Sequence, residues 1–272
     1  LSQLVVFAGD AEKGKYVKNI SFENIAFECT ASKTLLTDVV RKQMDEKYIL
    51  PEGGPTESWQ YQAAQSADAA ICGEGARNVE WRNCAVRHTA NYAFRLQDGC
   101  QSNRIVSCVL EDLGAGGLWL GAKESYVPPR EGREIARRIY WTTGPKSNAH
   151  NLISNCVIRS CVGNTGGGVR GYGTMYNTVI SNCYATTGGG GAHCTSTLNC
   201  YNCDFIANST TGGNGGGGYT MKSTGGYHPM LSNCTFRANT AAQNGVYGGR
   251  IIFNRIDKCD KAGYSEELIS EI

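Results

Sequence analysis

The sequence predicts an all-β solenoid, in which successive turns of the chain stack to form parallel sheets. Three observations lead to this class: an internal repeat of seven copies built on short Asn-Cys words, spacings of roughly 20 to 30 residues between most copies, and glycine-rich runs between the later ones. At 272 residues the chain is long enough to bury a large core. The expected domain is a single stack over residues 1–250.

The repeat has a regular apolar pattern. Its copies read S-F-E-N-I-A-F, E-W-R-N-C-A-V, R-I-V-S-C-V-L, L-I-S-N-C-V-I, V-I-S-N-C-Y-A, N-C-Y-N-C-D-F and M-L-S-N-C-T-F. The key positions are Ile25, Cys84, Cys108, Cys156, Cys183, Cys203 and Cys234. An apolar residue lies three before and two after each key, and a polar residue, usually Asn, lies directly before it. The step of two indicates a strand, and the step of three predicts a bend at the Asn, which tolerates the left-handed conformation.

The spacings between keys predict single turns with inserted segments. They are 59, 24, 48, 27, 20 and 31 residues, so the 48-residue interval is expected to cover two turns and the 59-residue interval to hold an insertion. We assign the insertion to residues 31–65 and expect a helix over 34–48, where the spacing is helical. Residues 122–149 form a basic and aromatic loop, 161–250 form glycine-rich turns, and 251–272 hold the last turn and a cap with a short helix from Ser265.

The 13 cysteines fit an internal column better than a set of disulfides. Their number is odd, so at least one thiol is free, and a chain of this length has no need of a disulfide scaffold. We interpret the column as a stack of small, polarizable side chains. The alternative is a zinc site at His193, Cys194, Cys200 and Cys203, but two of these cysteines already fall on core positions of the repeat. We therefore predict neither a metal nor another cofactor.

Charge and hydropathy exclude some classes of binding partner. The net charge of +2, with no basic arm, argues against a nucleic-acid partner, and no apolar run approaches the length of about eighteen residues that a membrane helix needs. The chain begins L-S-Q-L-V-V-F, without Met, so we expect a mature or trimmed chain from an extracytoplasmic protein. We expect it to be a monomer.

Three longer words carry a resemblance to known proteins. They are K-N-I-S-F-E-N-I-A-F, A-R-N-V-E-W-R-N-C-A-V-R-H-T-A-N-Y-A-F-R-L and D-G-C-Q-S-N-R-I-V-S-C-V-L-E-D-L-G-A-G-G-L-W-L-G. With the repeat, they resemble right-handed parallel β-helices of the pectate-lyase-like superfamily, and residues 17–160 resemble glycoside hydrolase family 141. The resemblance implies a carbohydrate-active protein that works on a complex, pectin-like polysaccharide. It also implies that acidic side chains of the protein lie in a groove along the solenoid.

Residues 161–250 differ in style and resemble the repeats of polymorphic outer-membrane proteins and adhesins. Of the 35 glycines, 21 lie in this window, and only five of its residues are charged. Such turns suit a binding stalk. The sequence therefore leaves two functions open: a glycoside hydrolase, or a non-catalytic glycan-binding, adhesin-like solenoid.

Glycosidic hydrolysis needs two carboxyl groups held across the bond. The resemblance carries over Asp112, in D-L-G-A-G-G, whose alternative role is to form an Asx turn before Gly114. Asp98 and Glu124 are the candidate partners, whereas Glu111 is expected to point to the other face of the strand. Acids are scarce in the later turns, which weighs against a hydrolase.

Side chains that could hold a saccharide lie near these acids. They are His88, Arg95, Tyr126, Arg130 and Trp141. Basic groups bind carboxylates, and aromatic rings stack on sugars, so these residues favour an acidic saccharide as partner. A polysaccharide lyase is less favoured, because no Asp cluster is available to bind calcium. A nucleotide loop is excluded, because G-A-G-G lacks the third glycine and the Lys.

Overall fold

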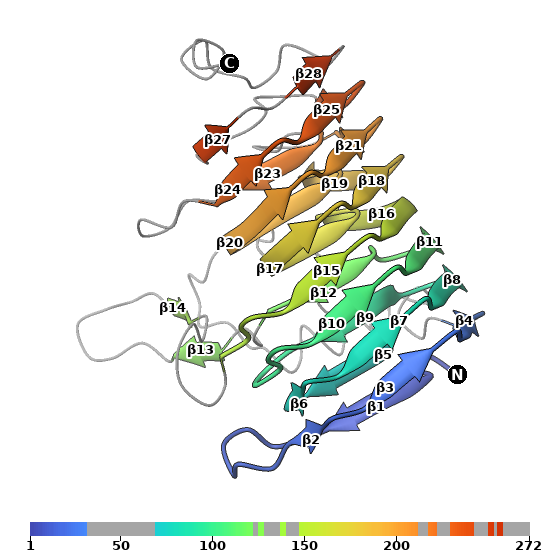
Figure 1. The fold of residues 1–272 in the computed structure, drawn as a ribbon, viewed down its shortest axis with the longest axis vertical. Helices are drawn as coiled ribbons and strands as arrows, with labels where there is room; N and C mark the ends of the chain where they lie inside the picture. Colours follow the sequence, from blue (N-terminus) through green and yellow to red (C-terminus); the bar gives the residue numbers. More distant parts are fainter. Residues whose placement is uncertain are drawn as a thin grey trace, which may run out of the picture.

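The computed structural model describes residues 1–31, 69–121, 125–127, 137–139, 147–211, 217–221, 229–241, 250–252 and 255–257. Within these residues every regular element is a strand, and nearly all pairing is parallel, which confirms the predicted all-β class with large parallel sheets. The strands rise in one stack from the N-terminal β1 to the C-terminal β28 (Figure 1). The predicted helices at 34–48 and from Ser265 lie outside the described residues.

Four ladders of stacked strands run along the molecule, and each turn of the chain adds a rung. Ladder A contains β1 (Val5–Ala8), β5 (Ala69–Glu74), β9 (Tyr92–Leu96), β12 (Leu118–Leu120), the first halves of β17 (Val169–Tyr176) and β20 (Ala192–Tyr201), and β23 (Tyr219–Met221). Ladder B contains β3 (Ser21–Glu23), β7 (Glu80–Arg82), β10 (Arg104–Val106), β15 (Leu152–Ser154), the second halves of β17 and β20, β24 (Met230–Ser232) and β27 (Arg250–Ile252). Because β17 and β20 run through both ladders, A and B form one sheet of 13 strands.

The second sheet, of 11 strands, holds the other two ladders. Ladder C contains β4 (Ala26–Glu28), β8 (Ala85–Thr89), β11 (Val109–Leu113), the first half of β16 (Val157–Thr165), β18 (Val179–Ser181), β21 (Asp204–Ile206), β25 (Thr235–Arg237) and β28 (Arg255–Asp257). Ladder D contains the second half of β16, β19 (Tyr184–Gly188), β22 (Ser209–Thr210) and β26 (Thr240–Ala241). Two small pairs complete the set: β2 (Val17–Lys18) with β6 (Ala76–Arg77), and β13 (Ser125–Val127) with β14 (Arg137–Ile139).

The corners between ladders are made by residues in the left-handed conformation. At the corner between ladders B and C the residues with positive φ, between 48° and 58°, are Asn24, Asn83, Ser107, Asn155, Asn177, Asn202 and Asn233. This confirms the predicted bend at the Asn of the repeat. The exposed amides also bond along the stack, since Asn177 Nδ2 donates to Asn155 Oδ1, and Asn202 and Asn233 continue the row at 3.1 and 2.8 Å.

One copy of the repeat was assigned to the wrong register. Val157 pairs with Val179, so Thr178, and not Cys183, follows Cys156 in the column of key residues. The inward residues of that turn are Met175 and Ile180, in place of the predicted Ile180 and Ala185. The physical reason is that Thr178 fills the cysteine position: it is fully buried, and its hydroxyl donates to the Tyr176 carbonyl at 2.9 Å.

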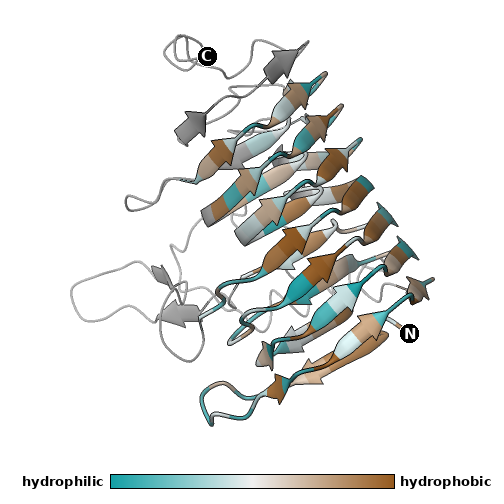
Figure 2. Cartoon of the chain, in the orientation of Figure 1, coloured by the Kyte–Doolittle hydropathy of each residue, from teal (hydrophilic) through white to brown (hydrophobic). Residues whose placement is uncertain are grey.

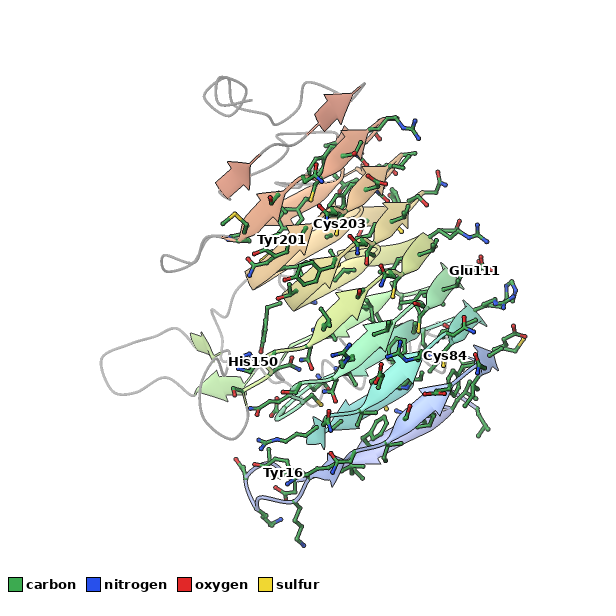
Figure 3. All side chains as sticks on the ribbon, in the orientation of Figure 1. Tyr16, Cys84, Glu111, His150, Tyr201 and Cys203 are labelled. Atoms are coloured by element: carbon green, nitrogen blue, oxygen red, sulfur yellow. The ribbon has the colours of Figure 1, made fainter. Side chains whose placement is uncertain are left out.

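The 48-residue interval was also misinterpreted. Val109 pairs directly with Val157, so Cys108 and Cys156 lie in adjacent turns, and the extra length belongs to the segment between β12 and β15 that holds β13 and β14. The key cysteines are buried. The thiols of Cys84, Cys108, Cys156 and Cys234 donate to carbonyls of the preceding turn, as Cys108 Sγ does to Trp81 O at 3.4 Å. No disulfide joins any two of the twelve described cysteines. Figure 3 shows Cys84 and Cys203 inside the stack.

Apolar residues alternate with polar ones along the strands and line the interior (Figure 2). In ladder C the inward column is Phe27, Val86, Leu110, Ile158, Ile180, Phe205 and Phe236. The later side chains of this column pack against glycines, because the backbone segment that leads into ladder A passes close to these side chains. A Cβ on Gly168 would lie 2.6 Å from Gly191 O and 2.7 Å from Ile180 Cγ2, so no larger residue fits. The glycine-rich style is thus a packing requirement.

Two rows of buried asparagines, which the repeat alignment did not reveal, bond to the backbone inside the stack. In the earlier row, Asn151 Oδ1 accepts from Asn103 N at 3.0 Å. In the later row, Asn208 Oδ1 accepts from Cys183 N at 3.0 Å, and Asn239 Oδ1 accepts from Asn208 N at 2.9 Å. Their amides satisfy backbone groups that the corners leave without strand partners.

Candidate functional site

The structure brings two of the predicted site residues into direct contact. His88, at the end of β8, and Asp112, near the end of β11, come from adjacent turns, and His88 Nδ1 lies 2.8 Å from Asp112 Oδ2. Both side chains are largely in solvent, with 57% and 70% of their surface exposed. Because a carboxylate can only accept a hydrogen bond, Nδ1 carries the proton, and in the neutral ring Nε2 is the basic nitrogen.

The backbone explains why these two side chains project together. The corner after ladder C is formed by one residue with positive φ in each turn, between 51° and 60°, and the column reads Cys29, His88, Asp112, Ser160, Asn182, Ala207 and Ala238. Asp and His tolerate this conformation better than most residues. The left-handed turn is therefore a property of the whole column, and what distinguishes its first members is their chemistry.

A row of ion pairs borders this corner on the outer face of ladder C. Arg87 Nε lies 3.6 Å from Glu28 Oε1 and 3.6 Å from Glu111 Oε1, and Arg159 Nε donates to Glu111 Oε2 at 2.6 Å. Glu111 projects from β11 at the edge of the stack (Figure 3). Glu111 therefore accepts a hydrogen bond from Arg159 and lies within ion-pair distance of Arg87. Asp112, one residue later, has left the strand direction at its corner.

The glycine loop after Asp112 is a close-packed connection between two strands. A Cβ on Gly114 would lie 2.7 Å from Ala90 O, and one on Gly117 would lie 2.4 Å from Gly168 O. Gly116 has a φ of +115° and lies against the Tyr92 ring. The glycines let the chain cross from ladder C to ladder A in contact with both neighbouring turns, and they leave Asp112 as the exposed group of the loop.

A buried cationic and aromatic cluster follows on the outer face of ladder A. Arg95, Trp119 and Arg170 occupy the same register in three successive strands, and the two guanidinium carbons lie 4.5 and 4.6 Å from the indole centroid. Tyr92 adds a ring contact at 5.6 Å. Since both faces of Trp119 are covered by arginines, a sugar has no open face to stack on there. The cluster instead packs two guanidinium groups against one aromatic ring on this sheet face.

Sequence reasoning named only Arg95 of this cluster. Trp119 stands in L-W-L, where alternation places it outward between two inward leucines, so the signal was present. Arg170 is one of the five charged residues of the glycine-rich turns, but its register opposite Trp119 depends on the residues inserted between β12 and β17. Such a pairing becomes visible only once the turns are counted correctly.

The predicted second acid lies elsewhere. Asp98 is 8% exposed, in the turn that leaves ladder A after β9, whereas Asp112 is at the corner after ladder C. The strand β10 and the B–C corner separate them along the chain, so they occupy different corners of one turn. Glu124, Arg130 and Trp141 lie outside the described residues. Tyr126 is in β13, which pairs antiparallel with β14, and only its backbone is described.

The four residues of the proposed zinc alternative do not converge. Cys194 packs inside with Cys200 and Cys203, and its sulfur accepts from Leu198 N at 3.1 Å, whereas His193 is on the outer face in register with Arg170. Within the described part of the chain, no group of three or more His, Cys, Asp or Glu side chains is arranged to hold a metal.

Burial sets the pKa of the cysteine thiols described next. It raises the pKa of the Cys161 thiol well above its ordinary value, with Cys183 and Asp112 adding to the effect. Burial likewise raises the pKa of the Cys100 thiol to about 12. Buried cysteines of this kind stay protonated and inert near neutral pH.

Comparisons with known proteins add one likeness. A solved structure named "Glycoside hydrolase" is similar to this chain with 15% sequence identity and a TM-score of 0.44, over 99% of this chain and 54% of that chain. The present chain thus spans about half the length of that protein. A likeness at this level decides neither fold nor activity. No protein-family model and no curated protein matches the sequence. Among the residues described, there is no helix of the length and hydropathy needed to cross a membrane.

Proposed function

We propose that the chain is a right-handed parallel β-helix that acts on a complex, acidic polysaccharide, with hydrolysis of a glycosidic bond as the reaction. The observation that carries the proposal is the contact between His88 and Asp112, because it presents an oriented, ionisable pair to solvent on a rigid corner. Rigid placement of an acid or base is what proton transfer at a glycosidic oxygen requires.

The roles of the residues follow from their chemistry. Asp112 is the carboxyl that exchanges a proton with the substrate, and His88 orients it through Nδ1. Arg95, which lies half-buried against Trp119, is the side chain that we assign to binding a carboxylate group of the saccharide. Glu124, the sequence candidate for the second carboxyl, lies outside the described residues. The natural location of such a protein is outside the cytoplasm, and we propose that it works as a monomer.

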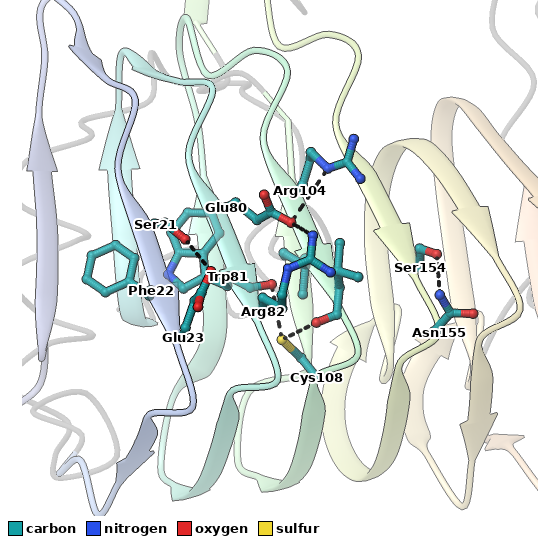
Figure 4. A network of polar contacts seen from close by, with 12 residues as sticks. Ser21, Phe22, Glu23, Glu80, Trp81, Arg82, Arg104, Cys108, Ser154 and Asn155 are labelled. Atoms are coloured by element: carbon teal, nitrogen blue, oxygen red, sulfur yellow. Dashed lines mark hydrogen bonds and ion pairs between the residues drawn. The ribbon is translucent and has the colours of Figure 1, made fainter.

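A non-catalytic glycan-binding role is the second candidate, and the later turns favour it. On ladder B, Tyr176 and Tyr201 stack at 4.9 Å with ring planes 15° apart, and Tyr176 is 39% exposed. The row of exposed asparagine amides runs beside them. Neutral, hydrogen-bonding and aromatic surface of this kind suits a sugar chain. The same ladder in the first turns is charged, with Glu80 bonded to Arg82 and facing Arg104 (Figure 4).

The test is to incubate the protein with a panel of acidic and neutral polysaccharides and to measure reducing ends and unsaturated products. We expect reducing ends without unsaturated products, and a loss on the order of a hundredfold or more in rate for Asp112→Asn, which keeps the shape but cannot transfer the proton. Binding is followed in parallel by affinity electrophoresis. Retained binding without any turnover of the unchanged protein would favour the second candidate and reject hydrolysis.

A further inference from the structure

The corner after ladder C carries a third reactive side chain. Cys29 precedes His88 in the column by one turn: Glu28 pairs with Arg87, and Cys29 N donates to Arg87 O at 3.4 Å. Asp112 follows His88 by one turn, since Arg87 pairs with Glu111. The register therefore places the backbone positions of Cys29 and Asp112 one turn to either side of His88.

The hydrogen bond to Asp112 fixes the chemistry of the ring between them. With Nδ1 donating to Asp112, the lone pair of a neutral imidazole is on Nε2, the nitrogen remote from the carboxylate. A thiol, a basic imidazole and an orienting carboxylate in this order are the parts of an activated nucleophile. In this protein all three come from one structural column.

Cys29 differs from the other cysteines of the described chain. It is exposed, Cys72 is half-buried, and the remaining ten are buried. The buried thiols of the key column donate to backbone carbonyls, as Cys84 Sγ does to Phe22 O at 3.4 Å. A core position therefore explains those thiols, whereas Cys29 occupies a corner where Ala207 and Ala238 meet the same backbone requirement.

We propose that Cys29, His88 and Asp112 form a thiol–imidazole–carboxylate site that hydrolyses acyl esters, with ester groups carried by the polysaccharide as substrate. The inference rests on the proposed function for the nature of the polymer, but it concerns a different bond. Glycosidic hydrolysis has no use for a thiol, whereas ester hydrolysis at this site depends on Cys29.

The reaction balances with water as the other reactant. His88 Nε2 takes the thiol proton while the Cys29 sulfur attacks the ester carbonyl, the carbon–oxygen bond breaks, and the alcohol leaves with the proton from His88. A thioester remains on Cys29. Water then attacks this thioester, His88 accepts a proton from the water, and the carbon–sulfur bond breaks. The acid is released, and the sulfur regains its proton from His88.

The first experiment measures reactivity of the thiol by mass spectrometry. The folded protein is treated with iodoacetamide at pH 7, and alkylation of Cys29 is followed with time. We expect His88→Gln to slow it by about tenfold or more and Asp112→Asn to slow it less, because the imidazole acts directly and the carboxylate through it. Ser160→Ala, one turn further along the column, is the matched control and leaves the rate unchanged. Equal rates in all four proteins would overturn the proposal.

The second experiment separates ester from glycosidic hydrolysis. Release of p-nitrophenol from p-nitrophenyl acetate, and of acetate and methanol from esterified pectin, is measured beside reducing ends. We expect Cys29→Ala to abolish ester hydrolysis, to leave any formation of reducing ends unchanged, and to keep the far-UV spectrum. Ester hydrolysis that persists in Cys29→Ala refutes the thiol site. Absence of reducing ends in the unchanged protein refutes only the glycosidic reaction.

Discussion

The corner after ladder C is built differently in the two halves of the stack. In the first three turns the exposed corner residues are Cys29, His88 and Asp112, followed by Thr30, Thr89 and Leu113. In turns five to seven the corner residues are Asn182, Ala207 and Ala238, of which Ala207 is half-buried, and they are followed by the buried Cys183, Asn208 and Asn239. The backbone makes the same left-handed bend in both halves. The first half presents a thiol, an imidazole and a carboxylate at the bend, whereas the later half presents an amide and two methyl groups there. The residue that follows the bend is buried in both halves.

The difference shows that the fold constrains conformation at the corner but not chemistry. Any residue that tolerates a positive φ satisfies the bend, so the outward side chain is open to functional use. The inward position one residue later is restricted by packing. The following predictions test whether the halves differ only in this way.

Alkaline pH tests whether both halves share one buried thiol core, and it has the largest expected effect. The pKa of Cys100 is about 12 in the folded chain against 9.0 ordinarily, so its stabilising contribution is complete below pH 9 and is lost as the pH rises toward 12. Each pH unit in this window lowers the free energy of unfolding by about 1.4 kcal/mol for this thiol. Burial also raises the pKa of Cys200, in the later half.

The measurement is denaturant unfolding at several pH values between 8 and 11, with hydrogen exchange to resolve the two halves. We expect the stability of both halves of the stack to decrease together as the pH rises. In Cys100→Ala the pH slope should decrease by about 1.4 kcal/mol per unit. A slope that is the same in this variant would mean that Cys100 does not hold its proton on account of burial.

Replacing Asn208 tests the structural role of the later half. In Asn208→Leu, Cys183 N and Ile180 O lose partners at 3.0 and 2.8 Å inside the stack. Unsatisfied buried groups cost about 1–3 kcal/mol each, so we expect a loss of about 2–5 kcal/mol in the free energy of unfolding. Urea denaturation measures it.

The comparison variant, at the outward corner position of the earlier half, is His88→Asn. Asn suits the left-handed corner, and the side chain is exposed, so the change in stability should stay within about 0.5 kcal/mol. If His88→Asn destabilises the protein as much as Asn208→Leu, then the first turns also depend on their corner side chains for stability, and the contrast between the halves is lost.

A glycine substitution tests the close approach in the later turns and has the smallest expected effect. A Cβ on Gly191 would lie 2.4 Å from Gly218 O, a backbone atom that cannot turn away. We expect Gly191→Ala to reduce the free energy of unfolding by about 1–3 kcal/mol. A lower midpoint temperature of thermal unfolding measures this loss. On Gly121 the nearest atom would be at 3.4 Å, so Gly121→Ala should be nearly neutral. Similar effects from both would show that loss of flexibility, and not the contact, sets the cost.

Much of the fold follows from the sequence, because stacked turns with parallel strands repeat their inward positions in each turn. Six of the seven key positions were aligned correctly, since Cys or Ile stands at each of them. Thr178 broke the pattern because a threonine satisfies the same buried position with a hydroxyl, and the true Asn-Cys word at Cys183 belongs to the next corner. Periodicity alone cannot separate two corners that use the same residues.

The candidate site was less accessible to sequence reasoning. His88 and Asp112 were each chosen on other grounds, and their contact depends on a register between residues 24 positions apart. The place of Cys29 beside them depends on a register across the long insertion. The buried role of Asp98 could not be inferred either, because an acid in a turn reads as exposed until the packing of that turn is known.

The row of exposed asparagine amides has a net dipole along the stack. Each amide donates toward the N-terminal end of the stack: Asn233 to Asn202, Asn202 to Asn177, and Asn177 to Asn155. Dipoles of about 3.5 D that point the same way add, whereas those of neighbouring strands largely cancel. The row therefore has a positive end near Asn155, beside the charged early turns, and a negative end near Asn233. A ligand lying along this edge therefore contacts a surface whose two ends differ in the sign of their partial charge.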